Sequence, residues 1–324
     1  MPYNPPMDST AAERRIRTYI RETPLTQSRA LSEATRARVY LKLENLQETG
    51  AFKLRGAANK LLSLTRDEAT RGLVAASTGN HALAVATIAR KLAIPAEIFV
   101  SEHIHPEKRA RIEALQARVN AVKGDALLAE VTARREAESS GRPYVSPYND
   151  PVVIEGQGTL AVEITRQLPR LGDDSLAAIF VAVGGGGLIA GIGAHLERVS
   201  PATLVVGCWP ENSPALHECM LAGEIIEVPE KPTWSTSTAG GVEPGAITLE
   251  MCRRVIDRSI LVTEEEILDA ARRVYRDDAQ LIEGAAAVAV AALLKSAADY
   301  AGSTVVIVVC GGNVDPGFAA RVRA

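Results

Sequence analysis

The chain has 324 residues, of which 47% are hydrophobic and 23% are charged, and its formal net charge is −3. These values are typical of a globular protein with one large or two moderate domains. The slightly acidic charge and the aromatic content of only 4% argue against a nucleic-acid partner, and no apolar stretch is long enough to predict a membrane span.

Short apolar runs alternate with helical patterns along most of the chain. The predicted strands are Val39–Leu43, Gly72–Ala76, Ala96–Val100, Ala177–Val183, Thr203–Trp209 and Thr304–Cys310. The predicted helices are His81–Leu92, Glu107–Gln116, Leu127–Glu138, Thr159–Leu168, Leu188–Val199, Glu264–Asp277 and Gly284–Leu294. Alternation with strands that are apolar throughout predicts buried parallel sheets and an α/β fold. The last helix is alanine-rich and apolar almost all round, which predicts a place in the core.

A lone lysine stands in the run Thr49–Ala57, where Lys53 follows Phe52 and glycines occupy positions 50 and 56. A lysine that reacts at neutral pH needs an amine that is partly desolvated or covalently engaged, because a free ammonium is no nucleophile. The glycines would let the backbone approach a ligand closely. The alternative is a solvated surface lysine beside a buried phenylalanine.

A second cluster, Ser77–His81, directly follows a predicted strand and opens a predicted helix. Helix N-termini present unpaired amide donors and a favourable dipole, so they bind anions. Ser77 and Asn80 add side-chain donors, which suits a carboxylate or a phenolic oxygen. Simple helix capping is the alternative, because Ser, Thr and Asn are preferred cap residues.

Four successive glycines, Gly184–Gly187, follow another predicted strand. Their backbone N–H groups can converge on a phosphate with no side chain in the way. A tight turn would need only one or two glycines, so a phosphate or a similar anion is the better interpretation.

The same turn also fits a dinucleotide motif. Gly185, Gly187 and Ala190 match the G-x-G-x-x-G/A spacing, and Glu211 lies about 20 residues further on, where a ribose-binding acid is expected. A nicotinamide-dependent dehydrogenase is therefore an alternative, although it leaves Lys53 without a role.

Cys310 opens the motif Cys310–Asn313 at the end of the last predicted strand. Its thiol could be a weak hydrogen-bond partner for a heterocyclic nitrogen, or one more buried cysteine. The four cysteines are widely spaced in apolar surroundings, which predicts free thiols rather than a disulfide framework or a zinc site. With no secretory signal pattern in the first ten residues, a cytoplasmic location is expected.

These motifs together resemble the serine/threonine dehydratases among the fold type II, tryptophan-synthase-β-like, pyridoxal-phosphate enzymes. The resemblance runs from about Ile16 to beyond Cys310. It includes Thr23-Pro24-Leu25, Lys42-Leu43-Glu44-Asn45, the Lys53 motif, Ser77–His81, Glu155–Thr159, the four glycines and Cys310–Asn313.

The resemblance implies a two-domain α/β fold with a bound pyridoxal 5'-phosphate, an amino-acid substrate and a homodimer. The large, parallel-sheet domain would comprise residues 1–47 and 148–324 and bind the cofactor. A smaller inserted α/β domain, residues 48–147, would bind the substrate carboxylate. Because the chain ends soon after Asn313, the resemblance also implies that a C-terminal regulatory domain is absent.

The resemblance also assigns residues to roles. Lys53 would form the Schiff base with the cofactor, and Phe52 would pack against its ring. Asn80 would hydrogen-bond the ring hydroxyl, and Cys310 would face the pyridine nitrogen, where many relatives have serine. The phosphate would be held by Gly184, Gly185, Gly186, Gly187 and Leu188. The substrate would be bound by Ser77, Thr78, Gly79, Asn80 and His81, with Tyr148 near its entrance.

The implied reaction is removal of the α-proton by the freed Lys53 amine, followed by loss of the β-hydroxyl, to give a 2-oxo acid and ammonia. Thr78 stands where serine racemases carry an acid–base serine, so a racemase is a disfavoured alternative. Trp209 and Ala215 align with the carboxylates of metal-activated relatives, so no divalent metal is expected.

Two features leave the substrate open. The loop Thr233–Gly241 departs from the usual Ala-Asp-Gly pattern, and Tyr148 replaces phenylalanine or asparagine. A bulkier or acidic substrate, such as a 3-aryl-serine, 3-hydroxyaspartate or a hydroxyectoine-derived compound, is therefore an alternative to serine and threonine. Glu283, at the start of the alanine-rich helix, either polarises the cofactor or only caps that helix.

Overall fold

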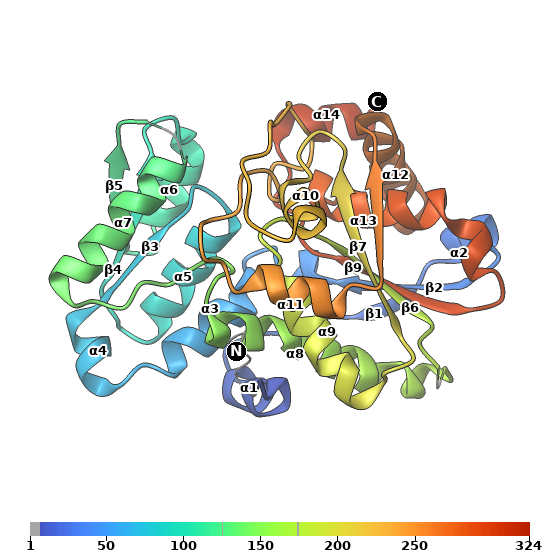
Figure 1. Cartoon of the computed structure of the whole chain (residues 1–324), viewed down its shortest axis with the longest axis horizontal. Helices are drawn as coiled ribbons and strands as arrows, with labels where there is room; N and C mark the ends of the chain where they lie inside the picture. The colour runs from blue at the N-terminus through green and yellow to red at the C-terminus, as the bar shows by residue number, and fades with distance from the viewer. Residues whose placement is uncertain (1–6, 125, 174) are drawn as a thin grey trace.

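The computed structural model describes residues 7–124, 126–173 and 175–324. Figure 1 shows two bodies side by side, each built around its own sheet. Residues 1–6, which belong to the segment without a signal pattern, lie outside the described residues. Within the described part of the chain, no helix has both the length and the hydropathy needed to cross a lipid bilayer.

The larger sheet has six strands in the order β1-β2-β9-β6-β7-β8. Their bounds are β1 Leu25–Gln27, β2 Arg38–Leu43, β9 Thr304–Val309, β6 Ala178–Ala182, β7 Leu204–Pro210 and β8 Arg258–Val262. All neighbouring pairs are parallel except β1 and β2. The predicted parallel sheet is therefore confirmed, with the addition of one short antiparallel edge strand.

The smaller sheet has three parallel strands in the order β3-β4-β5. They are β3 Leu73–Ala76, β4 Ala96–Ser101 and β5 Arg118–Val122. All three fall within residues 48–147, the predicted small domain, and its limits stay a prediction. The α/β fold class with a second, smaller unit is confirmed.

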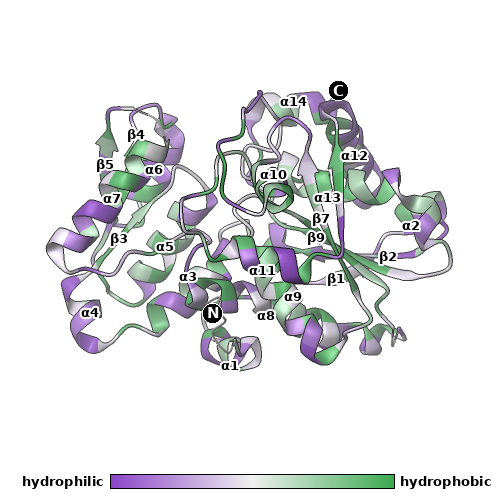
Figure 2. Cartoon of the chain, viewed as in Figure 1, coloured by the Kyte–Doolittle hydropathy of each residue, from purple (hydrophilic) through white to green (hydrophobic). Residues whose placement is uncertain are grey.

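Helices pack around both sheets. Their bounds are α1 Ser9–Ile16, α2 Arg29–Thr35, α3 Lys53–Leu62, α4 Arg66–Arg71, α5 Asn80–Lys91, α6 Pro106–Glu113, α7 Ala126–Ser140, α8 Pro151–Gln167, α9 Gly187–Val199, α10 Ala215–Ala222, α11 Thr248–Val255, α12 Glu264–Asp278, α13 Gly284–Lys295 and α14 Pro316–Arg323, with 3-10 turns η1 Glu44–Leu46, η2 Pro169–Leu171 and η3 Ala297–Tyr300. As predicted, α13 is a core helix: it packs along β6, β7, β8 and β9 and is buried through Leu293. Figure 2 shows that α13 is hydrophobic, whereas α4 and α12 are mainly hydrophilic.

Glycines bring three helices into close contact. A Cβ added to Gly156 of α8 would lie 2.8 Å from the Cα of Gly56 in α3. A Cβ added to Gly158 would lie 2.6 Å from the carbonyl oxygen of Gly191 in α9. The helix predicted to begin at Thr159 therefore begins too late: Asp150 caps α8, and its glycines serve helix packing rather than a loop. The order α3–α8–α9 fixes how far apart the starts of α3 and α9 lie.

Candidate active site

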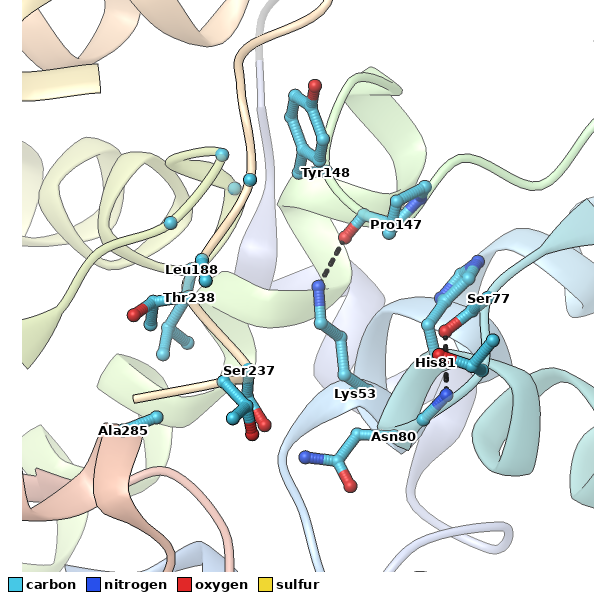
Figure 3. Close-up of a pocket in the computed structure, with 18 of the residues that line it drawn as sticks. Lys53, Ser77, Asn80, His81, Pro147, Tyr148, Leu188, Ser237, Thr238 and Ala285 are labelled. Atoms are coloured by element: carbon cyan, nitrogen blue, oxygen red, sulfur yellow. Dashed lines mark hydrogen bonds between the residues drawn. The ribbon is translucent and has the colours of Figure 1, made fainter. Parts of the chain in front are cut away.

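The predicted clusters meet in one cavity of about 380 Å³ between the two sheets. Such a volume is enough for a small cofactor or metabolite. The cavity is lined by every residue that the sequence assigns to the site: Phe52, Lys53, Ser77, Thr78, Gly79, Asn80, His81, Tyr148, Gly184, Gly185, Gly186, Gly187, Leu188 and Cys310. Figure 3 shows the Lys53 side chain with Leu188, Ser237 and Thr238 on one side, Ser77 and His81 on the other, and Asn80 below it.

Backbone contacts with the end of β9 fix the segment before Lys53. The N–H of Phe52 donates to the carbonyl of Cys310 at 3.0 Å, and the N–H of Gly312 donates to the carbonyl of Gly50 at 2.8 Å. Gly50 has φ +77°, a backbone conformation that glycine adopts without strain. These two hydrogen bonds hold residues 50–52 against residues 310–312, so α3 begins beside Cys310.

The Lys53 amine is partly desolvated. Its Nζ donates to the carbonyl oxygen of Pro147 at 2.7 Å (Figure 3). Burial lowers the pKa of Lys53 from 10.5 to about 8, although the groups at Cys310, Glu283 and Glu130 oppose the shift. The amine is therefore close to the pKa that suits a nucleophile or a base near neutral pH.

The lowered pKa predicts how Lys53 reacts in cofactor-free protein. We expect its labelling by an amine-specific reagent to rise with pH to a midpoint near 8, because only the unprotonated amine reacts. Labelling would be read by peptide mass spectrometry, with a free peptide of residues 49–57 as the hydrated control. Glu130→Gln should move the midpoint down, because the Glu130 carboxylate holds the pKa up. A Lys53 midpoint equal to that of the free peptide would contradict this prediction.

The Ser77–His81 segment joins β3 to α5. Gly79 occupies the N-cap of α5 and no side chain caps the helix, so the simple capping interpretation is wrong. The Ser77 hydroxyl instead accepts from the N–H of Gly79 at 3.1 Å. The start of α5 therefore keeps amide donors available at the cavity wall, as anion binding requires.

His81, at the second position of α5, is neutral. Its Nε2 donates to the carbonyl of Val145 at 2.8 Å, and its buried Nδ1 has no hydrogen-bond partner among the described residues. Burial first, and then the charge of Lys53, lower the pKa of His81 to about 3. The imidazole therefore contributes no positive charge to the site at neutral pH.

A buried polar cluster lies beside the end of β9. The Asn80 amide donates to both carboxylate oxygens of Glu283, at 3.2 and 3.1 Å, and accepts from Asn313 Nδ2 at 2.8 Å. The Sγ of Cys310 lies 4.0 Å from Glu283 Oε1. Burial raises the pKa of Glu283, while Asn80 and Ser237 oppose that shift. The Glu283 side chain makes no capping bond to α13, so the cap-only interpretation of this residue is wrong.

The four glycines pack too closely for side chains. A Cβ added to Gly185 would lie 2.4 Å from Cγ of Tyr148, and one added to Gly184 would lie 3.0 Å from the backbone of Thr238. Gly186 has φ +85° and forms the N-cap of α9. Each position therefore needs glycine for a contact or for its backbone conformation.

Donors in this loop remain open. Among the described residues, no acceptor is recorded for the backbone N–H groups of Gly185, Gly186, Gly187 and Leu188. They stand at the N-terminus of α9, where the helix dipole favours an anion. A phosphate-bearing group fits this cradle, because it would supply the missing acceptors.

Tyr148 connects the glycine loop to residues 236–241, a segment over the cavity that we call the strap, through Glu243 just after it. Its ring lies against Gly185, and its hydroxyl accepts from the N–H of Glu243 at 2.9 Å. Burial raises the pKa of Tyr148, so the phenol stays protonated. The carboxylate of Glu243 also accepts a hydrogen bond from Arg134 of α7. The strap therefore touches both the glycine loop and the small-sheet body.

Sequence reasoning noted the loop Thr233–Gly241 only as a departure from the usual pattern, and it assigned neither this loop nor the charged lining residues to the site. The strap contributes Thr236, Ser237, Thr238, Ala239, Gly240 and Gly241, and the small-sheet body contributes Ser101, Lys108 and Glu130. The run of small residues in the strap was a usable signal, because small side chains allow close approach to a ligand. The charged residues come from α6 and α7, where nothing in sequence separates them from ordinary surface charges.

The structure does not support the dinucleotide motif. Glu211, its expected ribose-binding acid, lies away from the cavity and pairs with Lys295 at 3.6 Å. That expectation was therefore wrong, since the turn and the acid do not face a common space. Trp209 is fully buried against His217, with ring centroids 5.2 Å apart. Among the residues that the structure describes, no three metal-binding side chains gather into a site, and the expected lack of a divalent metal stays a prediction.

Comparison with known proteins gives a consistent result. A family described as "Pyridoxal-phosphate dependent enzyme" matches residues 16–311. The L-threonine ammonia-lyase of Thermotoga maritima is 39% identical over 97% of this chain and 77% of its own. A solved threonine deaminase from T.th. has a TM-score of 0.87 and 35% identity, covering 95% of this chain and 97% of that one. Maize serine racemase has a TM-score of 0.89 and 28% identity, covering 97% and 95%.

Proposed function

The chain belongs to the family of pyridoxal-phosphate dependent enzymes, and on this basis we propose that it is a dehydratase of a β-hydroxy amino acid. As an ammonia-lyase of the serine/threonine type, it releases a 2-oxo acid and ammonia. The observation that carries the proposal is the Lys53 amine, whose pKa burial lowers to about 8, in a cavity that also holds a glycine cradle for a phosphate. The resemblance of the sequence to the serine/threonine dehydratases is thereby confirmed at the level of the family.

Pyridoxal 5'-phosphate fits the donor set of the cavity. The open N–H groups from Gly185 to Leu188 would hold its phosphate, Lys53 would be its covalent attachment point, and Phe52 would pack against it. Asn80 and Cys310 would bind the ring hydroxyl and face the ring nitrogen. When bound, the cofactor supplies an electron-accepting ring that takes up the negative charge left by the α-proton.

The chain's own groups would move the α-proton. Lys53 Nζ would accept it, because about one tenth of an amine with a pKa of about 8 is unprotonated at pH 7. The Pro147 carbonyl, 2.7 Å from Nζ, would orient the amine. Since Pro147 precedes Tyr148, the same short segment would place the base and cover the glycine loop.

The start of α5 would bind the substrate carboxylate. Amide groups of residues 77–81 provide donors at a helix N-terminus, and they bind the anion without help from a positive charge on His81, which is neutral. The strap over residues 236–241 would exclude water from the reacting carbon, and Glu243 would hold it through Arg134 and Tyr148. Exclusion of water would also strengthen each of these polar contacts.

Release of 2-oxo acid from four substrates tests the proposal. The panel is L-threonine, L-serine, L-threo-3-hydroxyaspartate and L-threo-phenylserine, with ammonia measured in parallel. We expect equal amounts of 2-oxo acid and ammonia from threonine or serine. Turnover of the aspartate or phenylserine analogue alone would overturn the serine/threonine type, and no turnover of any of them by protein that holds the cofactor would overturn the dehydratase proposal.

We also propose a cytoplasmic location and a homodimer. The four cysteines at 208, 219, 252 and 310 are free and buried, which agrees with a reducing compartment. The dimer rests on the resemblance. Light scattering decides it, since a monomer has a mass of 34.4 kDa.

A further inference from the structure

A cluster of four buried charges is centred on Arg55, two residues after Lys53. Its members, here called the Arg55 cluster, are Lys42, Glu44, Arg55 and Glu163, and none of them has solvent exposure. They come from four different elements: β2, η1, α3 and α8. Two positive and two negative groups cancel, so the cluster is neutral as a whole. Fully buried charges are costly unless they are paired and hydrogen-bonded.

Arg55 is the centre of the cluster. Its Nε and Nη2 donate to the two oxygens of Glu44, each at 2.8 Å. Its Nη1 and Nη2 donate to the two oxygens of Glu163, at 2.9 and 2.8 Å. A guanidinium that holds two carboxylates with both edges is fixed in orientation as well as in place.

Two further cations complete the pairing of Glu163: Arg17, whose Nη2 donates to Glu163 Oε1 at 2.5 Å, and the buried Lys42. The Lys42 Nζ donates to Glu163 Oε2 at 2.6 Å, to the carbonyl of Thr23 at 2.7 Å and to Gln167 Oε1 at 2.9 Å. Burial works against the charged form of Glu163, but Arg55 and Lys42 outweigh it and lower the pKa of Glu163 to about 2. Glu163 is therefore ionised at neutral pH.

The cluster joins the two bodies of the molecule at the start of α3. The apolar side of α3, including Leu54, Ala57 and Leu61, packs in the core of the small sheet. Arg55 points the other way, to η1 and α8 of the large body. Gly56 touches α8 at the same crossing, and its N–H donates to Gln157 Oε1 at 3.1 Å. Lys53 thus begins a helix that is built into one body and anchored by charge to the other.

The groups that would bind the phosphate lie in the large body, at the start of α9. Because α8 packs against both α3 and α9, the separation between Lys53 and the glycine loop depends on how α3 sits on α8. The Arg55–Glu163 contact fixes that crossing. No member of the cluster is among the groups that shift the pKa of Lys53, which are Cys310, Glu283 and Glu130.

We propose that Arg55 is a positioning residue for the reaction: through Glu44 and Glu163 it holds Lys53 at the distance from the glycine loop that turnover requires. This inference rests on the proposed function. It assigns the cluster a geometric effect on Lys53 and no effect on its basicity. A displacement of about 1 Å in a reacting group can cost on the order of 100-fold in rate.

The test uses Arg55→Lys, which keeps the charge and loses the two-edged contact. We expect kcat on the preferred substrate to fall on the order of 10- to 100-fold, while KM changes by less than about threefold because the carboxylate site at α5 is untouched. The midpoint of Lys53 labelling in cofactor-free protein should stay near pH 8. Arg38→Lys is the matched control, since Arg38 grips Asp173 with two hydrogen bonds of 2.9 Å away from the cavity. It should leave kcat unchanged.

Arg55→Met is the harsher variant, because it leaves the buried Glu44 carboxylate with the Thr23 hydroxyl but no ion-pair partner, while Glu163 keeps Lys42 and Arg17. For this variant we would measure the free energy of unfolding and the yield of covalent cofactor attachment, and neither measurement requires turnover. The proposal is overturned if Arg55→Lys keeps the wild-type kcat. It is also overturned if the midpoint pH of Lys53 labelling shifts and this shift accounts for the whole loss of kcat, because Arg55 would then act on the basicity of Lys53 and not on its position. Failure of the wild-type protein on all four substrates would instead count against the proposed function, and cofactor attachment in the Arg55 variants would still test positioning.

Discussion

Replacing Lys53 by alanine is expected to lower 2-oxo acid release by at least about 10³-fold, because one substitution removes both the attachment point and the base. The protein itself should stay folded. The Lys53 side chain makes one hydrogen bond, to the Pro147 carbonyl, and lines a cavity rather than the core. Circular dichroism and thermal unfolding should therefore remain close to wild type, while turnover and the visible absorbance of bound cofactor are lost.

Lys60→Ala is the matched control for that experiment. Lys60 lies on the same helix and pairs with Asp150 at 2.6 Å, outside the cavity. This variant should keep both cofactor and turnover. If Lys53→Ala retained even a tenth of the wild-type rate, Lys53 could not be the base.

Gly185→Ala is expected to weaken cofactor binding at least tenfold and to lower the free energy of unfolding by about 1–3 kcal/mol. The added methyl group would lie 2.4 to 2.6 Å from three atoms of the Tyr148 ring. The ring cannot swing aside freely, because the Tyr148 hydroxyl is tied to the strap through Glu243. The glycine loop must then move, and its N–H groups lose their convergence on the phosphate. Cofactor dissociation constants and urea unfolding measure the two effects.

A double substitution tests whether the clash with the Tyr148 ring is what weakens cofactor binding in Gly185→Ala. In Gly185→Ala/Tyr148→Ala the obstructing ring is gone, so part of the lost cofactor affinity should return relative to Gly185→Ala alone. Tyr148→Ala by itself supplies the fourth corner of the cycle. If the two substitutions weakened binding additively, the steric account of the glycine loop would be wrong.

The apolar runs and the glycine-rich motifs made much of the architecture predictable. All six predicted strands occur, because runs such as 304–309 are apolar throughout and can only be buried. The missed strands have weaker signals. In β5, residues 118–122 are partly exposed and alternate poorly, the first two residues of β8 are exposed, and β1 has only three residues. Their pairing depends on neighbours that a local pattern does not contain.

The late start predicted for α8 has a different cause. Gly156 and Gly158 lie just before the predicted helix, yet each is needed inside α8 for close contact with α3 or α9. A tertiary contact overrode a local preference, as often happens with glycine in helices. The N-cap at Asp150 and Pro151 after it were the available signals of the true start.

Site residues could be predicted where the local sequence indicates a particular chemistry. They could not be predicted where their role depends on ion pairs between residues that are far apart in the sequence. Four glycines in a row and a lysine between glycines pointed to the cavity from sequence alone. The Arg55 cluster did not, because nothing in the local sequence around Lys42, Glu44 and Arg55 indicates that the fold buries them together with Glu163. Members of the cluster that form ion pairs lie up to 121 residues apart along the chain, so no local pattern shows the pairing.

The central claim is that Lys53 carries the cofactor of a β-hydroxy amino acid dehydratase. Reducing the holoenzyme with borohydride, digesting it and locating the pyridoxyl group by mass spectrometry tests this claim most directly. We expect one pyridoxyl group per chain, on the peptide that contains Lys53, and its absence when an excess of the preferred substrate is present at the moment of reduction. A pyridoxyl group on any other lysine, or none on a protein that releases 2-oxo acid, would contradict it.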